Sequence, residues 1–97
     1  MKRREEQPLG DVLREALEAD PVFREKILSI RIQRGWREAL GPTILRYTRN
    51  LYVKKRVLYV QLSSSVVRQT LLMRKTELIK ELNTYARGEA IIDIVLR

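Results

Sequence analysis

The chain has 97 residues, of which 44% are hydrophobic and 33% charged, and its formal net charge is +8. This length and composition predict one globular domain with a modest core and argue against general disorder. Because the chain has no His and no Cys, disulfides, the usual zinc sites and the Ser-His and Cys-His nucleophile pairs are excluded. We therefore expect a protein that is not an enzyme and that holds no metal or other cofactor.

The start of the chain is basic and polar, which predicts a flexible segment at 1–8 ahead of a single domain at 9–97. No apolar region suited to a secretory signal follows this start, and no run of about 18 apolar residues occurs anywhere. We therefore expect a cytoplasmic protein without a membrane span.

The first predicted element is a short amphipathic helix. Its apolar residues follow helical spacing and are Leu9, Val12, Leu13, Ala16 and Leu17. It should end near Asp20, because Pro21 disfavours helical backbone at the residue before it. We expect this helix to pack on the domain, although its short length and terminal position leave open an arm that docks on a partner.

A second helical stripe follows and contains Phe23, Ile27, Leu28, Ile32, Trp36, Ala39 and Leu40. Gly35 interrupts this helix at some cost, and Gly41 followed by Pro42 is a signal for its end. Trp36 could be a stacking platform for a base, but its place on the apolar stripe favours a core anchor.

Residues 50–62 have the composition of a β-hairpin. If Val53 pairs with Leu58, Tyr52 lies opposite Tyr59, and both tyrosines point away from the apolar face. The turn at 54–56 has no Gly or Asn, so we expect a four-residue loop built on a type I turn. That loop would carry three adjacent positive charges at its tip.

The next segment predicts either one long helix or two helices over residues 66–86. Ser63, Ser64 and Ser65 offer hydroxyl groups that could cap its start. The basic pair Arg74-Lys75 interrupts its apolar stripe, and Thr76 followed by an acidic residue offers a fresh cap. Gly88 should end the helical region.

The end of the chain predicts a strand, because residues 90–96 are rich in β-branched side chains. Ala90, Ile92, Ile94 and Leu96 would lie on one face of this strand. The element order is then α-α-β-β-α(α)-β, which predicts an α+β fold with a three-stranded sheet covered by helices on one face.

Acidic residues are absent between Ala39 and Thr76, whereas eight basic residues occur there. The remainder of the chain has 12 basic and 12 acidic residues, so the whole net charge lies in this stretch. Such a block indicates a surface that faces a polyanion, with nucleic acid as the first candidate. The alternatives are a solvated charged face and a tyrosine pair that only covers the sheet. The basic face could also contact an acidic protein, whereas an anionic membrane fits less well because the charges do not accompany a strongly amphipathic exposed helix.

The candidate nucleic-acid-binding residues are the eight cations, which would contact phosphates, and two tyrosines, which would stack on unpaired bases. They are Arg46, Arg49, Lys54, Lys55, Arg56, Arg68, Arg74, Lys75, Tyr52 and Tyr59.

Five segments together resemble a bacterial family, the domain-of-unknown-function family number seven hundred and twenty-one, which includes the DciA replicative-helicase loaders. These segments are residues 36–42, 47–48, 57–64, 77–83 and 92–97. The resemblance covers roughly residues 9–97, and the chain looks most like the short form found in Bacteroidetes. It implies a KH-like fold of the type II order and two partners, the replicative DNA helicase and single-stranded or forked DNA.

One departure from nucleic-acid-binding KH domains concerns their G-x-x-G loop. The equivalent place here, near residues 73–76, has no glycine, so phosphate contacts there would depend on the side chains of Arg74 and Lys75. Two other functions remain open, a protein–protein adaptor without a DNA role and a small RNA-binding KH-like protein.

Overall fold

The computed structural model describes residues 6–97, except for the side chains of residues 6–8 and 18. Its elements are α1 (Glu6–Glu18), α2 (Pro21–Ala39), α3 (Pro42–Arg46), β1 (Thr48–Lys54), β2 (Val57–Leu62), α4 (Ser65–Met73), α5 (Lys75–Ala86) and β3 (Asp93–Leu96). Residues 1–5 of the segment expected to be flexible lie outside the described residues, and residues 6–8 begin α1.

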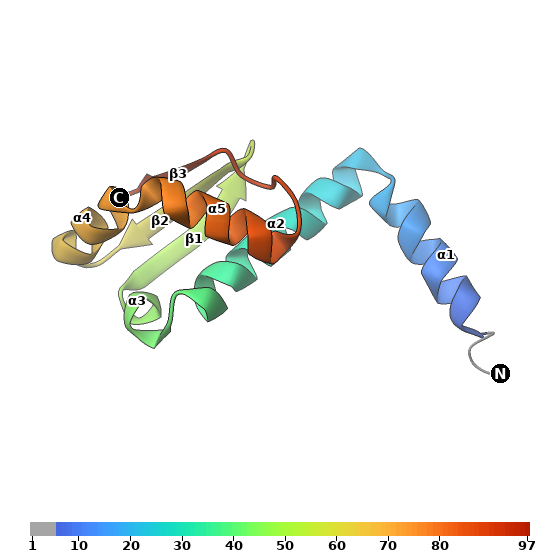
Figure 1. Cartoon of the computed structure of the whole chain (residues 1–97), viewed down its shortest axis with the longest axis horizontal. Coiled ribbons are helices and arrows are strands. Elements are labelled where there is room, and N and C mark those ends of the chain that lie inside the picture. Colours follow the sequence, from blue (N-terminus) through green and yellow to red (C-terminus); the bar gives the residue numbers. More distant parts are fainter. Residues whose placement is uncertain (1–5) are drawn as a thin grey trace.

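The three strands form one mixed sheet in the order β1-β2-β3 (Figure 1). β1 and β2 are antiparallel, with Val53 opposite Leu58 and Tyr52 opposite Tyr59, so the predicted register is confirmed. β3 lies parallel to β2. Helices α2, α4 and α5 pack on one face of the sheet, which confirms the predicted KH-like α+β arrangement.

The core lies between the sheet and these helices. Ile32 and Trp36 of α2, Leu58 of β2, Leu82 of α5 and Ile94 of β3 are fully buried in it. The indole Nε1 of Trp36 donates a 3.0 Å hydrogen bond to the hydroxyl of Thr48, so its polar atom is satisfied inside the fold. Trp36 is therefore a core anchor, as its position on the apolar stripe predicts.

Gly35 allows α2 and α5 to approach closely. A Cβ atom at this position would lie 3.0 Å from Cδ1 of Tyr85 and 3.3 Å from Cδ2 of Leu82. The glycine that interrupts the apolar stripe thus marks a helix–helix contact, where the missing side chain leaves room for the Tyr85 ring.

The end of α2 is confirmed at Gly41-Pro42, but the short helix α3 that begins there was not predicted. Gly41 has a φ of 91°, which a residue with a side chain rarely adopts, and Pro42 begins the next helix. Five residues are too few to show a helical period in the sequence.

The region 66–86 is divided into two helices at Arg74, whose φ of −112° and ψ of 21° interrupt the helical backbone. The hydroxyl of Ser64 caps α4 by accepting a hydrogen bond from Val67 N–H at 3.2 Å, as expected for this serine run. The expected cap at Thr76 is wrong, because α5 begins one residue earlier and makes no side-chain cap bond.

The final strand is shorter than predicted, because residues 90–92 form no strand. Asn83 Nδ2 donates to the carbonyl of Ile91 at 2.9 Å, and Ile91 N–H donates to Asn83 Oδ1 at 3.0 Å. These two hydrogen bonds to α5 direct Ile91 into the core and leave Ile92 largely exposed. The expected common face is therefore wrong at Ile92, because Ala90 and Ile94 are buried and Ile92 is not.

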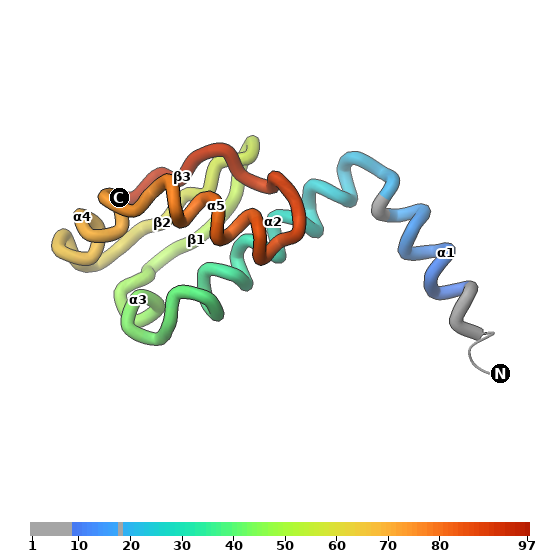
Figure 2. The backbone as a smooth tube through the Cα atoms, viewed as in Figure 1, coloured from blue at the N-terminus to red at the C-terminus, as the bar shows by residue number. Residues whose placement is uncertain are grey.

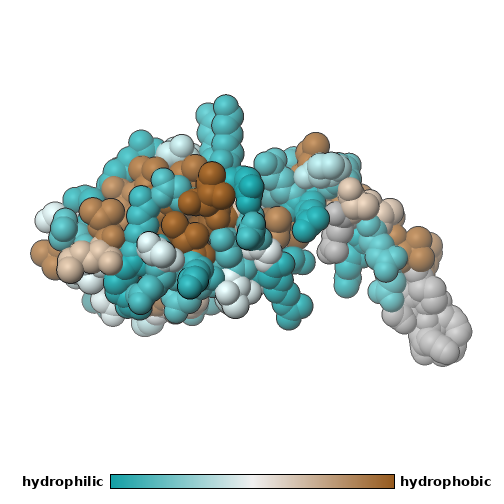
Figure 3. All heavy atoms as spheres, turned by 45° about the horizontal axis from the view of Figure 1, so that its top comes forward, coloured by the Kyte–Doolittle hydropathy of each residue, from teal (hydrophilic) through white to brown (hydrophobic). Residues whose placement is uncertain are grey.

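Helix α1 extends away from the domain as an arm, so its expected packing on the domain is wrong (Figure 1). The backbone bends sharply at Ala19 and Asp20, and Figure 2 traces this bend. The carboxylate of Asp20 then caps α2 by accepting a 3.0 Å hydrogen bond from Val22 N–H. Apolar side chains are visible along the arm in Figure 3.

Candidate nucleic-acid interface

The tip of the β1–β2 hairpin presents three adjacent cations. Lys54 ends β1 and pairs with Val57, and the loop consists only of Lys55 and Arg56. All three side chains are exposed. No ion pair among the described residues involves Lys54 or Lys55, so their charges remain available to an anionic ligand.

The expected four-residue type I loop is wrong. Lys55 and Arg56 have φ values of 50° and 64°, and positive φ at both residues of a two-residue loop is what a type I′ turn requires. The twist of this turn matches the twist of the two strands, and that match prevails over the preference of these positions for Gly or Asn.

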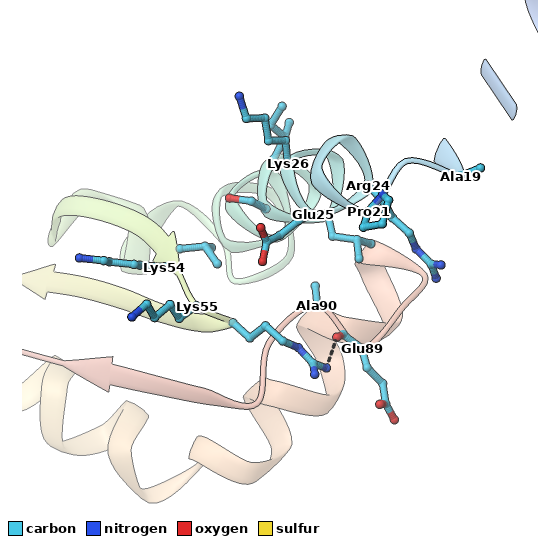
Figure 4. Close-up of a pocket in the computed structure, with 14 residues that line it drawn as sticks. Ala19, Pro21, Arg24, Glu25, Lys26, Lys54, Lys55, Glu89 and Ala90 are labelled. Atoms are coloured by element: carbon cyan, nitrogen blue, oxygen red, sulfur yellow. Dashed lines mark hydrogen bonds between the residues drawn. The ribbon is translucent and has the colours of Figure 1, made fainter. Parts of the chain in front are cut away.

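Arg56 also fixes the tip to the segment after α5. Its Nη2 donates a 2.6 Å hydrogen bond to the carbonyl of Glu89, shown as the dashed line in Figure 4, and its own carbonyl accepts from Ile92 N–H at 2.8 Å. The partner of the guanidinium is a neutral carbonyl, so the positive charge is retained while its position is fixed.

A groove of about 900 Å³ lies beside the tip, between the N-terminal half of α2 and the segment at 89–90. Leu28, Val53 and Ala90 contribute apolar side chains to its lining. Its basic lining residues are Arg24, Lys26, Lys54, Lys55 and Arg56.

Two carboxylates also line this groove and reduce its positive potential. Glu25 points from α2 toward the space above Ala90, whereas Lys26 points away from it (Figure 4). The other acid is Glu89. The tip side of the groove, with Lys54 and Lys55, is therefore its most positive part.

Sequence reasoning missed Arg24 and Lys26, which belong to the same groove as the tip. Both flank Glu25 along the chain, so the local charge there is small and no basic run is visible. Only the packing of the hairpin beside α2 places these two residues in the lining of the same groove as the tip.

The two candidate cations at the α4–α5 junction are engaged in ion pairs. Arg74 Nε lies 3.1 Å from Glu77 Oε1, and Lys75 Nζ lies 2.8 Å from Asp93 Oδ1. The hydrogen bond from Lys75 holds the pKa of Asp93 below its usual value, and the bond from Ile94 N–H adds to this effect. Acids from outside the acid-free stretch thus offset these two charges.

Three further candidate cations lie away from the tip. Arg46 ends α3 and Arg49 lies near the start of β1, so both occupy the end of the hairpin opposite its turn. Arg68 is half-buried in α4, where its Nη2 donates to the carbonyl of Leu62 at 3.5 Å. Its contact favours a structural role over a ligand contact.

The two candidate tyrosines stack on each other on the open face of the sheet. The rings of Tyr52 and Tyr59 are 4.9 Å apart between centroids and nearly parallel, at 11°. The guanidinium of Arg97 lies 5.2 Å from the centroid of Tyr59 and donates a 2.8 Å hydrogen bond to the hydroxyl of Tyr52. A small cavity of about 300 Å³ beside them is also lined by Asn50 and Gln61.

This arrangement limits how a base could stack there. Tyr52 and Arg97 both lie against the ring of Tyr59, whereas Tyr52 belongs to the edge strand β1. A stacking base would therefore use Tyr52 or displace Arg97. The sequence predicted the tyrosine pair but gave no signal for the arginine, which follows β3.

Within residues 6–97, every helix is too short or too polar to span a lipid bilayer. The described side chains also form no cluster of three or more acids that could hold a metal ion.

The fold and the exposed tip define a small KH-like module with a basic β-hairpin. A family model described as Dna[CI] antecedent, DciA, matches residues 8–96. The chain therefore belongs to the DciA family, a family of helicase loaders and adaptors rather than of known enzymes. No curated protein sequence matches the chain significantly.

Proposed function

We propose that this protein is a non-enzymatic adaptor of DNA replication that binds the replicative helicase and single-stranded or forked DNA. The observation that carries this proposal is the membership of nearly the whole chain, residues 8–96, in the DciA family. The exposed cations of the hairpin tip support the DNA part, because such side chains release counterions when they contact phosphates.

In this proposal the DNA backbone binds at the hairpin tip and not at the α4–α5 junction where KH domains place their glycine loop. The junction has no glycine for close backbone approach, and Arg74 and Lys75 already face acids. Lys54 and Lys55 would contact phosphates, and Arg24 would extend the contact along the groove.

The DNA part is tested by fluorescence anisotropy with labelled single-stranded DNA over a salt series. Replacing Lys54 and Lys55 with Ala should lower the affinity and reduce the slope of log K against log salt by about 1 to 2. The matched control replaces Arg74 and Lys75 with Ala, which removes the same number of charges and should change the slope less. Absence of binding at low salt would refute the DNA part.

The helicase part is tested by affinity capture with nuclease treatment, which separates a direct protein contact from a shared nucleic acid. Capture that persists after charge reversal at residues 54–56, together with no DNA binding by the wild type, would favour the protein–protein adaptor. Tighter binding to RNA than to DNA of the same sequence would favour the RNA-binding alternative.

A further inference from the structure

Helix α1 exposes an apolar stripe that the domain does not cover. The exposed fractions are 76% for Leu9, 60% for Val12, 58% for Leu13 and 39% for Leu17. An isolated helix of 13 residues is marginally stable in water, because helices of this length depend on packing of their apolar face. Packing of this stripe against another surface would therefore stabilise the arm.

A cleft of about 790 Å³ lies between α1 and α2. Leu13 and Leu17 line its α1 side, and Phe23, Ile27 and Ile30 line its α2 side. Two apolar helical walls that diverge from one bend form a seat suited to a third helix, which would contact both walls.

The charge at this cleft selects an acidic occupant. Its charged lining residues are Arg14, Arg31, Arg34 and Arg87, and no acidic residue lines it among the described residues. Arg31 already has contacts within its own chain, including a 3.3 Å hydrogen bond to the carbonyl of Ala86, so the charge argument depends on Arg14, Arg34 and Arg87. An apolar helix with acidic flanks would therefore complement both the walls and the rim.

Helix α1 itself has these properties. The segment 6–18 contains four acidic residues and one basic residue, whereas the whole chain is strongly basic. Its apolar stripe is exposed, with Asp11 and Glu15 beside it in the sequence. We propose that α1 of a second copy occupies the cleft, and that the two copies form a two-fold symmetric dimer in which each arm enters the cleft of the other.

When each arm enters the cleft of the other copy, both copies contribute the same surface, which consists of the arm and the cleft, as a two-fold interface requires. Each α1 spans about 20 Å at 1.5 Å per residue, and the proposed contact includes its stripe from residue 9 to residue 17. The lining of the cleft includes no residue of the hairpin tip, so the dimer leaves both tips accessible.

The dimer is tested by sedimentation equilibrium or light scattering of the full chain over a concentration series. The expected result is a shift from the mass of one chain to the mass of two. Leu13→Glu should raise the dissociation constant about 100-fold, because it places a charge between apolar walls. Val66→Glu is the matched control, since Val66 is 73% exposed on α4, and it should leave the dissociation constant unchanged.

A mixing experiment identifies the occupant. One variant carries Asp11→Arg and Glu15→Arg, and the other carries Arg34→Glu and Arg87→Glu. Each variant alone should dimerise poorly, whereas the mixture should form a heterodimer in which both contacts join opposite charges. A wild-type mass of one chain up to about 1 mM would overturn the proposal, and so would a mixture that associates no better than its components.

Other occupants of the cleft give distinct results that also overturn the dimer. If α1 closes onto its own α2, the mass stays that of one chain at every concentration. If the cleft seats a helix of the helicase instead, Leu13→Glu abolishes helicase capture while the wild type alone remains monomeric. If no dimer is observed, the proposal of DNA binding is unaffected, because DNA binding is tested separately with substitutions at the hairpin tip.

Discussion

Lys55 and Arg56 occupy backbone conformations that glycine adopts more easily. Both have positive φ, which brings the Cβ atom of an ordinary residue close to its own backbone and costs about 1 kcal/mol per residue. The tip therefore retains two cations where Asn-Gly would form the turn with less strain. Such a preference for charge over stability is typical of a ligand-binding position.

Replacing Lys55 with Gly should raise the free energy of unfolding by about 0.5 to 1 kcal/mol and weaken DNA binding. Lys54→Gly is the control, because it removes the same charge from a residue inside β1 and should lower the free energy of unfolding by a similar amount. Urea unfolding and DNA anisotropy measure the two effects. A less stable Lys55→Gly variant would contradict the left-handed turn.

The ion pair between Lys75 and Asp93 should be detectable in the pH titration of the Asp93 carboxyl group. Its pKa is lowered in the folded protein, so its contribution to stability is present above its unfolded pKa and is lost as the pH falls through the folded pKa. Lys75→Gln should raise the pKa of Asp93 toward its usual value without reaching it, because Ile94 N–H still donates at 2.8 Å.

The titration of Asp93 can be followed by NMR at its carboxyl carbon. Arg74→Gln removes the same charge from the neighbouring residue and should leave the pKa of Asp93 nearly unchanged, because Arg74 pairs with Glu77. An equal shift in both variants would show that the pKa of Asp93 is set by the overall positive charge nearby and not by the direct contact with Lys75.

The candidate cations could be found in the sequence, but their environments could not. The run at 54–56 is local and visible, and so is the absence of acids around it. The pairing of Lys75 with Asp93 joins residues far apart in the chain, and it depends on how α5 packs beside β3. For the same reason, the contribution of Arg24 to the tip groove has no signature in the sequence.

At the scale of elements, the contact between α2 and α5 depends on Gly35. Gly35→Ala would gain up to about 1 kcal/mol of helix propensity, but its Cβ would press on the Tyr85 ring. The hydroxyl of Tyr85 on α5 donates to the carboxylate of Glu38 on α2, which restrains the ring, and Leu82 is fully buried. We therefore expect a net loss of about 1 to 2 kcal/mol in stability.

A double-mutant cycle measured by chemical unfolding separates the gain in helix propensity from the steric effect of the Tyr85 ring. In a Tyr85→Ala background the ring is removed and only the 3.3 Å contact with Leu82 Cδ2 remains, so Gly35→Ala should cost less stability than in the wild type. An equal loss in both backgrounds would place the cause elsewhere than at the Gly35–Tyr85 contact.

The main helices and the hairpin register could be predicted because each repeats a pattern along the chain. Apolar spacing revealed α1, α2, α4 and α5, and strand alternation fixed the partner of Val53. The start of β3 could not be predicted, because two hydrogen bonds from Asn83 set the conformation of Ile91. The extension of α1 away from the domain also could not be predicted, because an apolar stripe does not show which surface it contacts.

At the scale of the whole molecule, the buried core of the domain does not include the arm. All buried core residues lie between Ile32 and Ile94, and the cap of α2 is supplied by Asp20. Deleting residues 1–19 should therefore change the free energy of unfolding by no more than about 0.5 kcal/mol when it is measured on dilute protein. A larger loss would show that α1 contributes to the domain fold and is not only an arm.

The mixed sheet has a consequence for the order of folding events. β1 and β2 are joined by two residues and can pair within about 10 microseconds, whereas the parallel partners Leu58 and Ile94 are separated in the chain by α4 and α5. We therefore expect β3 to join last. Substitutions in the hairpin should slow refolding, whereas Ile94→Val should mainly accelerate unfolding in stopped-flow experiments.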